Sequence, residues 1–279
     1  FGVELCEIAA THGVRYLFEA SVGGGIPILR TMKTSLAANE IYGIDGILNG
    51  TTNYILTHMK DDGTSFAEAL AQAQQKGYAE ANPKADVDGD DACRKICILA
   101  ALAFGAMIPQ SLVSCDGIAG VTLDTIEKAE KFGGNIKLIA SARRMTGEKI
   151  DISVSPCVVS YDNPLSGVSD VFNAIMIHAQ HLGDVMMYGK GAGKLPTASA
   201  VLSDIIEIIK AGKGSAQETW NIGDPGMLSD NYKVSDTYCV YIPHSFGASS
   251  EKVLSLFGKA QEVFSDNEGF GIIIENVSR

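Results

Sequence analysis

The stretch "GYAEANPKADVDGDDACRKICILAALAFGAMI" (residues 77–108) sets a run of acidic residues directly before a long apolar segment. Five carboxylates gather before and at the start of a helical pattern, and the chain then carries no charge from Ile96 to Ile108. Carboxylates at a helix N-terminus stabilise the helix by roughly 0.3–1 kcal/mol each. The pattern therefore predicts a largely buried helix whose N-cap is Asp88, with Asp91 as the second half of a capping-box-like pair.

Helix capping does not account for Lys95, which follows Asp91 by one turn on a stripe that is otherwise apolar. A buried lysine must be paired or functional, so we expect an Asp91–Lys95 pair at the rim of a cleft. An ordinary exposed ion pair fits the pattern equally well. Glu80 and Asp86 lie on the loop before the helix and could reach the same cleft. A lysine with a carboxylate partner suits general acid or base chemistry, and carboxylates beside it suit a ligand that carries an ammonium group.

The composition indicates a folded, acidic protein. Of 279 residues, 46% are hydrophobic, and the formal net charge is −11. Phosphate binding needs clustered Lys and Arg, which are not present, so we expect no nucleic-acid partner. No apolar run approaches the roughly 18 residues of a membrane span and the start lacks a signal-peptide pattern, so we expect a cytoplasmic protein without a membrane partner. The helical pattern begins directly at Phe1, from which we expect that a preceding segment has been removed.

The six cysteines are scattered without a CxxC pair, which is typical of small buried hydrophobic residues. Two of them, Cys93 and Cys97, share a helix face, but we do not expect a metal there. The full set is Cys6, Cys93, Cys97, Cys115, Cys157 and Cys239.

The periodicity along the chain predicts an α/β protein, with a mixed β-sheet covered by helices. The span from Asn135 to Gly189 contains four strand-like runs at hairpin spacing. A strand is also expected to lead through Asn49 into a helix. The other expected elements are an opening helix that ends at Gly13, a strand over Val14–Ala20, a short helix after Pro27, a helix over Ser65–Lys76, a long helix in "LPTASAVLSDIIEIIKAG", and a tail of strand "DTYCVYIP", helix "SSEKVLSLFGKAQEVFSD" and strand "FGIIIENV".

Three glycine-containing turns could contact a ligand. "GKGAGKLPT" (residues 189–197) is not a phosphate-binding P-loop, because Tyr188 and Leu195 stand where Gly and Ser or Thr are required. It still predicts a strand-to-helix turn whose backbone amides could approach a phosphate or a cofactor. "VGGGIP" (residues 22–27) could aim successive carbonyls at a hard cation. "NGTT" (residues 49–52) is typical of a helix cap that could also face a ligand.

Four motifs together resemble homoserine dehydrogenase: "FEASVGGGIPILR", "GILNGTTNYIL", "GYAEANPKADVDGDDACRK" and "GKGAGKLPTASAV". They occur in that family's order and spacing, and the resemblance extends from Phe1 to about Asp230. It implies interconversion of L-homoserine and L-aspartate 4-semialdehyde with NADP or NAD, in threonine, methionine and isoleucine biosynthesis. It also implies a homodimer or higher homo-oligomer.

The resemblance assigns roles residue by residue. Lys95 would be the proton donor or acceptor at the substrate oxygen, and Asp91 would orient substrate and lysine. Glu80 would bind the homoserine amino group, with Asp86 close by. A monovalent cation, sodium, would be held largely through backbone carbonyls of Glu19, Val22, Gly24 and Ile26. The residues expected to lie toward the cofactor are Asn49, Gly50, Thr51, Gly77, Gly191 and Gly193.

The resemblance also divides the chain into segments. Residues 1–21 would be the C-terminal edge of a Rossmann nucleotide-binding domain, 22–190 the substrate-binding, catalytic and dimerisation domain, and 191–230 a segment that returns toward the nucleotide-binding domain. Residues 235–279 resemble part of an ACT regulatory domain, although its acidic-x-Pro-Gly turn is not found in "PHSFGASS".

The family's N-terminal G-x-G-x-x-G nucleotide-binding half does not occur in the sequence, nor does a second lysine that the resemblance places on a loop just before the position of Phe1. We therefore expect the chain by itself not to turn over homoserine. The alternative function is a non-catalytic, ACT-type amino-acid-binding regulatory subunit.

Overall fold

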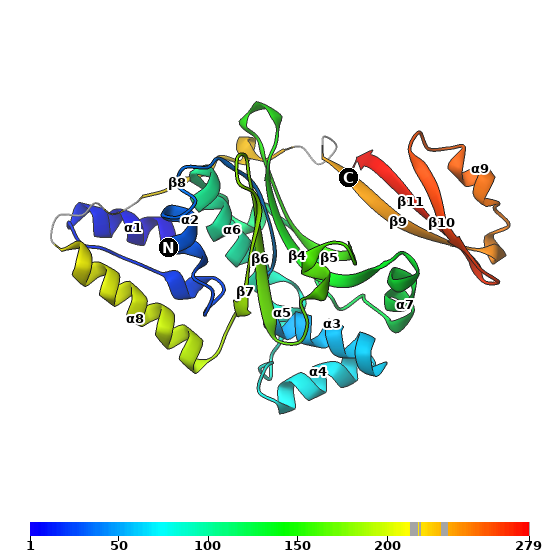
Figure 1. Cartoon of the computed structure of the whole chain (residues 1–279), viewed down its shortest axis with the longest axis horizontal. Coiled ribbons are helices and arrows are strands. Elements are labelled where there is room, and N and C mark those ends of the chain that lie inside the picture. Colours follow the sequence, from blue (N-terminus) through cyan, green and yellow to red (C-terminus); the bar gives the residue numbers. More distant parts are fainter. Residues whose placement is uncertain (213–216, 218, 230–233, 279) are drawn as a thin grey trace.

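A six-stranded mixed sheet forms the centre of the molecule (Figure 1). The structure is a computed structural model that describes residues 1–212, 217, 219–229 and 234–278. The strands lie in the order β3-β5-β4-β1-β6-β7, and every neighbouring pair is antiparallel except β3 and β5. The α/β class and the four predicted β runs are confirmed. The strands are β1 (Ile41–Ile47), β3 (Ser114–Cys115), β4 (Gly134–Arg144), β5 (Ile150–Ser160), β6 (Phe172–Ala179) and β7 (Gly183–Lys190).

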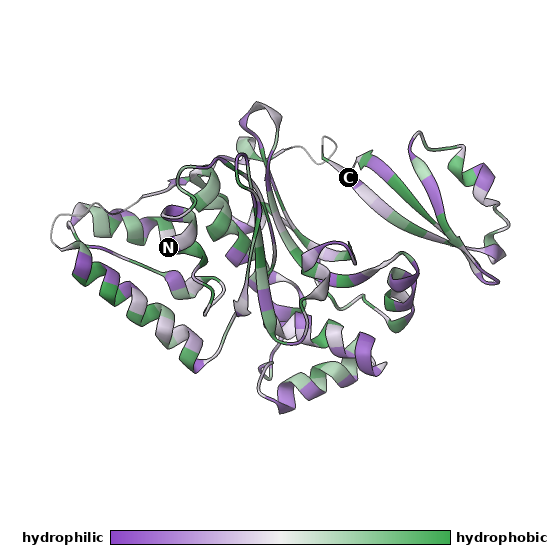
Figure 2. Cartoon of the chain, viewed as in Figure 1, coloured by the Kyte–Doolittle hydropathy of each residue, from purple (hydrophilic) through white to green (hydrophobic). Residues whose placement is uncertain are grey.

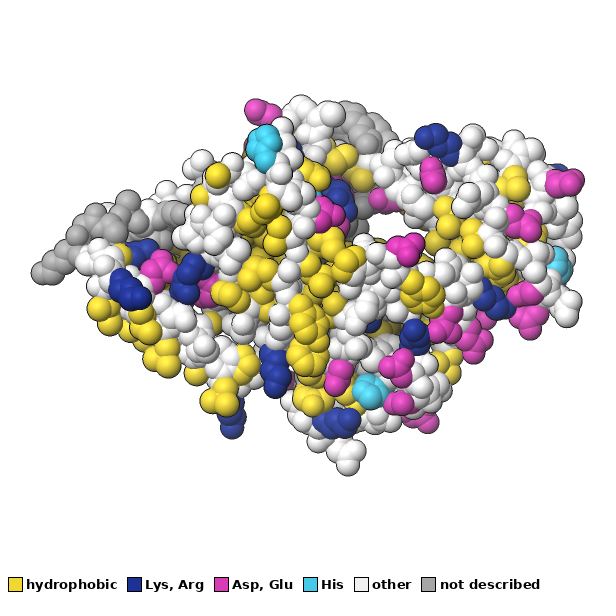
Figure 3. Space-filling model, viewed as in Figure 1, with side chains coloured by type: hydrophobic (Ala, Val, Ile, Leu, Met, Phe, Trp, Pro, Cys, Tyr) yellow, Lys and Arg dark blue, Asp and Glu magenta, His cyan; other side chains and the backbone are white. Residues whose placement is uncertain are grey.

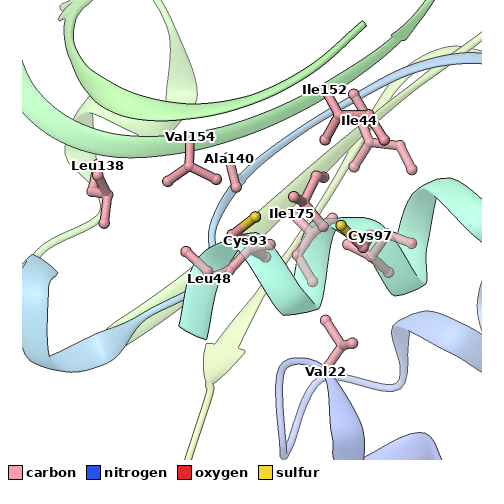
Figure 4. Close-up of a cluster of buried hydrophobic side chains, with 14 of the residues drawn as sticks. Val22, Ile44, Leu48, Cys93, Cys97, Leu138, Ala140, Ile152, Val154 and Ile175 are labelled. Atoms are coloured by element: carbon pink, nitrogen blue, oxygen red, sulfur yellow. The ribbon is translucent and has the colours of Figure 1, made fainter. Parts of the chain in front are cut away.

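Helices pack on one face of this sheet and form the main core with it. Figure 4 shows Cys93 and Cys97 of helix α6 among apolar side chains of the sheet, including Ile175. Both cysteines are buried, as expected, whereas Cys239 is exposed, so the expectation was wrong for that residue. The helices are α1 (Gly2–Thr11), α2 (Ile28–Lys33), α3 (Gly50–Asp62), α4 (Phe66–Gln75), α5 (Lys84–Val87), α6 (Asp90–Phe104), α7 (Leu123–Lys131), α8 (Lys194–Ala211) and α9 (Ser250–Leu254).

Helix α6 begins one residue later than predicted. Asp88 is not its N-cap; it closes α5 and forms an ion pair with Lys84. The N-cap is Gly89, at φ 86°, a left-handed conformation that glycine adopts without a steric penalty. A Cβ atom there would also lie 3.0 Å from Cys115 Sγ. The sharp turn between α5 and α6 therefore decides where α6 starts.

The predicted strand over Val14–Ala20 does not form among the described residues. Residues 14–18 are assigned neither helix nor strand, and Glu19–Ser21 is a single 3-10 turn. A strand requires a partner for its backbone groups. Here the Tyr16 amide donates to the Gln217 side chain instead, at 2.7 Å. The nearby strands β2 (Ala106–Met107) and β8 (Asn221–Ile222) pair only with each other.

The C-terminal segment forms a separate three-stranded sheet with the order β10-β11-β9 (Figure 1). Its strands are β9 (Ser235–Pro243), β10 (Ala260–Ser265) and β11 (Gly269–Ser278). The helix predicted over Ser249–Asp266 is wrong in its second half, because α9 ends at Leu254 and residues 260–265 form β10. Antiparallel pairing of β10 with β11 satisfies that backbone and overrides the helical pattern.

Candidate active site

Asn49 lies at the centre of the polar cluster that the sequence predicted. It is the N-cap of α3: its Oδ1 accepts from the Thr52 amide at 2.9 Å. Its Nδ2 donates to Asp86 Oδ1 at 2.7 Å and to Asp91 Oδ2 at 2.9 Å. One buried asparagine therefore joins the start of α3 to carboxylates from α5 and α6.

The predicted Asp91–Lys95 pair is present. Lys95 Nζ lies 2.6 Å from Asp91 Oδ2, and it also donates to the Leu48 carbonyl at 3.0 Å. The Asp91 side chain is 30% exposed and that of Lys95 is 20% exposed. The pair is thus partly buried and tied to the residue that follows β1, and its place at the rim of a cleft stays a prediction.

Asp86 is an electrostatically perturbed member of this cluster. Burial raises the pKa of Asp86, and the nearby negative charge of Asp91 raises it further. The hydrogen bond from Asn49 and the charge of Lys95 act in the opposite direction. Two carboxylates that share one amide donor form a site in which a ligand ammonium group would relieve charge repulsion.

Two of the predicted glycine turns lie against each other. The Gly25 amide donates to the Lys190 carbonyl at 2.9 Å. A Cβ atom at Gly24 would lie 2.4 Å from the Gly191 carbonyl oxygen, so this close approach requires glycine. The candidate cation-binding turn is therefore packed on the turn between β7 and α8, which was expected to face a cofactor.

Asn173 was not predicted as a site residue, although it lies between Gly50 and Gly191. A Cβ atom at Gly191 would lie 2.2 Å from Asn173 Cγ, and one at Gly50 would lie 3.5 Å from Asn173 Oδ1. Asn173 is 1% exposed. A polar residue inside the apolar run "VFNAIMI" was the signal that could have identified it.

The structure does not bring every predicted residue to this cluster. Glu80 is exposed, and the contact seen for it is a hydrogen bond from Gln74 to its backbone carbonyl. Gly77, at φ 75°, follows the end of α4, and no described residue other than its two chain neighbours comes within 4 Å of its Cβ position. Thr51, by contrast, does lie beside the cluster: it is in the first turn of α3, its hydroxyl donates to the Tyr78 carbonyl at 2.7 Å, and its side chain also acts on Asp86, whose pKa it lowers. Gly193 is the N-cap of α8.

The Glu19 carboxylate binds the start of α2. It accepts from the amides of Leu29 and Arg30 at 2.9 Å each, and burial raises the pKa of Glu19. The Glu19 amide donates to Asp204 Oδ2 on α8 at 2.9 Å, and Arg30 pairs with Asp204 at 3.1 Å. The ion-pair network that fixes Glu19 was missed, because it depends on α8 packing against α2.

Carbonyl oxygens of Val22, Gly24 and Ile26 would suit a hard monovalent cation, because such ions prefer oxygen ligands. This donor set contains a single acidic side chain, Glu19. Among the described residues, no cluster of three or more His, Cys, Asp or Glu residues could hold a metal ion. The same part of the chain contains no helix that is both long and apolar enough to cross a membrane.

Comparisons with known proteins agree with the predicted resemblance. The sequence profile described as homoserine dehydrogenase matches residues 27–206. A homoserine dehydrogenase of Synechocystis is 50% identical over 212 residues, which are 75% of this chain and 49% of the relative. The chain therefore spans about half the length of the curated relatives it matches. The profile match falls on the candidate site, and none of the comparisons favours the regulatory-subunit alternative.

Solved structures agree at the level of the fold. A homoserine dehydrogenase from Thiobacillus denitrificans superposes with a TM-score of 0.82 and 31% identity, covering 100% of this chain and 67% of that chain. A hyperthermophilic archaeal homoserine dehydrogenase in complex with NADPH gives a TM-score of 0.65 at 30% identity, covering 78% of this chain and 62% of that chain. The four motifs, the profile match and these folds together place the chain in the homoserine dehydrogenase family.

Proposed function

We propose that the protein containing this chain interconverts L-homoserine and L-aspartate 4-semialdehyde with NADP or NAD. The observation that carries the proposal is the joined group of Asn49, Asp86, Asp91 and Lys95. This activity would serve threonine, methionine and isoleucine biosynthesis in the cytoplasm. The archaeal relative bound to NADPH supports NADP as one cofactor.

Lys95 would move the proton at the substrate oxygen. An ammonium group has three N–H donors, and two of those of Lys95 are directed to Asp91 and the Leu48 carbonyl. The third is left for the aldehyde oxygen, to which it gives a proton as the alcohol forms. In the reverse direction the neutral amine takes that proton back. The bound dinucleotide would supply or accept the hydride.

The substrate ammonium group would lie beside the carboxylates. Asp86 and Asp91 are held in place by Asn49, and Glu80 would close over the amino group from the exposed loop after α4. Because a positive ligand favours the ionised carboxylate, substrate binding would lower the pKa of Asp86 from its raised value.

The cofactor and cation sites would flank this group. Backbone amides at the start of α3 and α8 suit the cofactor, with Asn49, Gly50, Thr51, Gly77, Gly191 and Gly193 as its candidate contacts. The turn formed by Glu19, Val22, Gly24 and Ile26 would hold sodium and thereby brace the Gly191 turn against which it packs.

We also propose that the chain forms a homodimer through the outer face of the six-stranded sheet. Tyr42, Met186 and Tyr188 are 45%, 39% and 54% exposed on this sheet. Figure 3 shows hydrophobic side chains gathered over the central strands. An apolar sheet face of this kind is typical of a subunit interface. Sedimentation should show a dimer at micromolar concentration, and Tyr188→Glu should yield monomers; a monomeric parent would contradict this proposal.

The segment boundaries remain part of the proposal: 1–21, 22–190, 191–230 and 235–279. Residues 213–216, 218 and 230–233 lie outside the described residues. The β9-α9-β10-β11 order of the last segment is compatible with part of an ACT-like module.

The test uses the full-length protein with homoserine and either NADP or NAD. Lys95→Met should lower kcat by a factor on the order of 10² to 10⁴ with little change in the homoserine KM. Arg94→Met is the matched control, because Arg94 is an exposed cation on the same helix that bonds Gln110. Near-normal turnover of the Lys95 variant would remove it from the mechanism, and no turnover by the wild type would reject the proposed function.

A further inference from the structure

Asn173 is buried without a hydrogen-bond partner for its side chain. It lies on β6 and is 1% exposed, and neither Nδ2 nor Oδ1 bonds another described group. A buried polar group without a partner costs roughly 1–3 kcal/mol. Asn53 on α3 gives the contrast: it is equally buried, but its Nδ2 donates to the carbonyls of Val168, Asp170 and Phe172. Asn53 is explained by structure alone, and Asn173 is not.

Two glycines make room for the Asn173 carboxamide. A Cβ atom at Gly191 would lie 2.2 Å from Cγ, 2.3 Å from Nδ2 and 2.5 Å from Oδ1, so a side chain there would collide with the whole group. At Gly50 a Cβ atom would lie 2.8 Å from the Val171 carbonyl oxygen and 3.5 Å from Asn173 Oδ1. The carboxamide thus lies between the N-terminus of the 13-residue helix α3 and the turn between β7 and α8.

This position is next to the proposed reaction centre. Gly50 directly follows Asn49, whose side chain holds Asp86 and Asp91. A ligand group that reaches Asn173 between the two glycines would therefore lie beside the groups that hold the substrate and Lys95. The free donor and free acceptor of a carboxamide are complementary to those of a second carboxamide.

We propose that Asn173 positions the cofactor by pairing with the carboxamide of its nicotinamide ring. This inference rests on the proposed function and assigns a specificity role to a residue outside the predicted set. The Nδ2 group would donate to the ring's amide oxygen, and Oδ1 would accept from its amide nitrogen. The pairing would fix which face of the ring is turned to the substrate.

The experiment measures dissociation constants of two oxidised dinucleotides by calorimetry with the full-length protein. One is NADP, and the other is its 3-acetylpyridine analogue, in which a methyl group replaces the amide nitrogen. The wild type should bind NADP about 3- to 10-fold more tightly, the range expected for one hydrogen bond. Asn173→Leu should bind both equally well, and Asn173→Ala serves if the leucine variant does not fold.

Thermal unfolding separates this role from a structural one. Asn173→Leu should keep or raise the Tm, because it removes unpartnered groups, whereas the control Asn53→Leu should lower it sharply. A wild-type preference that persists in the Asn173 variants, or a wild type without preference, overturns the inference alone. If Asn173→Leu lowered the Tm as much as Asn53→Leu does, the inference would also be overturned, because an ordered water would then be the partner of the Asn173 carboxamide. Failure of the wild type to bind NADP or NAD, or to oxidise homoserine, would reject the proposed function itself.

Discussion

Replacing Asn49 by aspartate would convert the amide that joins two carboxylates into a third carboxylate. The new side chain keeps the Oδ1 atom that caps α3 through the Thr52 amide. Its second oxygen would replace Nδ2, which now lies 2.7 Å from Asp86 Oδ1 and 2.9 Å from Asp91 Oδ2. Three carboxylates at such distances cannot all stay ionised, so the folded state of Asn49→Asp should take up a proton near neutral pH.

The magnitude follows from that proton. Holding one carboxyl protonated at pH 7, when its unfolded pKa is about 3.9, costs up to about 4 kcal/mol. A folded-state pKa that is raised gives stability that is present at low pH and lost as pH rises toward the folded pKa. One additional proton bound in the folded state changes the free energy of unfolding by about 1.4 kcal/mol per pH unit. Between pH 7 and pH 5 the variant should therefore regain roughly 2–3 kcal/mol relative to the wild type.

Urea unfolding at half-unit steps from pH 5 to pH 8 measures this dependence. Asn49→Ser is the matched control, because serine is a good N-cap and adds no charge. Its unfolding free energy should depend on pH less steeply than that of the aspartate variant, because it removes the hydrogen bond that lowers the pKa of Asp86 but adds no third carboxylate. If the aspartate and serine variants had the same pH dependence, Asn49 would not lie between Asp86 and Asp91 as described, and the proposed arrangement of the active site would be wrong.

Three further predictions concern stability. The hydrogen bond that His178 donates to Asp45 raises the pKa of His178, which also contacts Asp184. This pairing should therefore stabilise the wild type below pH about 6.5 and fade as pH rises through the raised pKa. His178→Gln should lose that dependence in urea titrations, and an unchanged slope would refute it. Gly191→Ala should lower stability by about 1–3 kcal/mol through its collision with Asn173, and a double-mutant cycle should show relief when Asn173→Ala is added; additive effects would argue against the contact. Asp204→Ala should cost roughly 1–3 kcal/mol in chemical denaturation, because it leaves the buried Glu19 amide without an acceptor and removes one of the two carboxylates that Arg30 contacts. A loss below about 0.5 kcal/mol would contradict the role of that network.

Helix α8 illustrates what the local sequence predicts and what it does not. The sequence predicted α8 from its apolar periodicity and the nearby Pro196, and the structure confirms it. Figure 2 shows hydrophobic residues along much of this helix. The periodicity could not reveal that Asp204 turns inward to meet Glu19 and Arg30, since those residues are more than 170 positions away.

The sequence by itself determined those features that depend on residues within about one helical turn of each other along the chain. The Asp91–Lys95 pair follows from the i,i+4 spacing of a helix, and the cap at Asn49 follows from the change from strand to helix. The sequence also indicated the homoserine dehydrogenase family, because the four motifs of that family are long and occur in the family's order.

Only the tertiary structure decided which of these features meet. Asn49 contacts Asp86, 37 positions along the chain, because the turn between α5 and α6 returns to the end of β1. Asn173 and Gly191 face each other because antiparallel pairing of β6 and β7 brings the start of one strand beside the end of the other. Such contacts depend on sheet register and on close approach of backbones. Neither sheet register nor close backbone approach produces a periodic pattern in the sequence. The residues that meet are separated by whole helices and strands, and the packing of these elements is set by the common core.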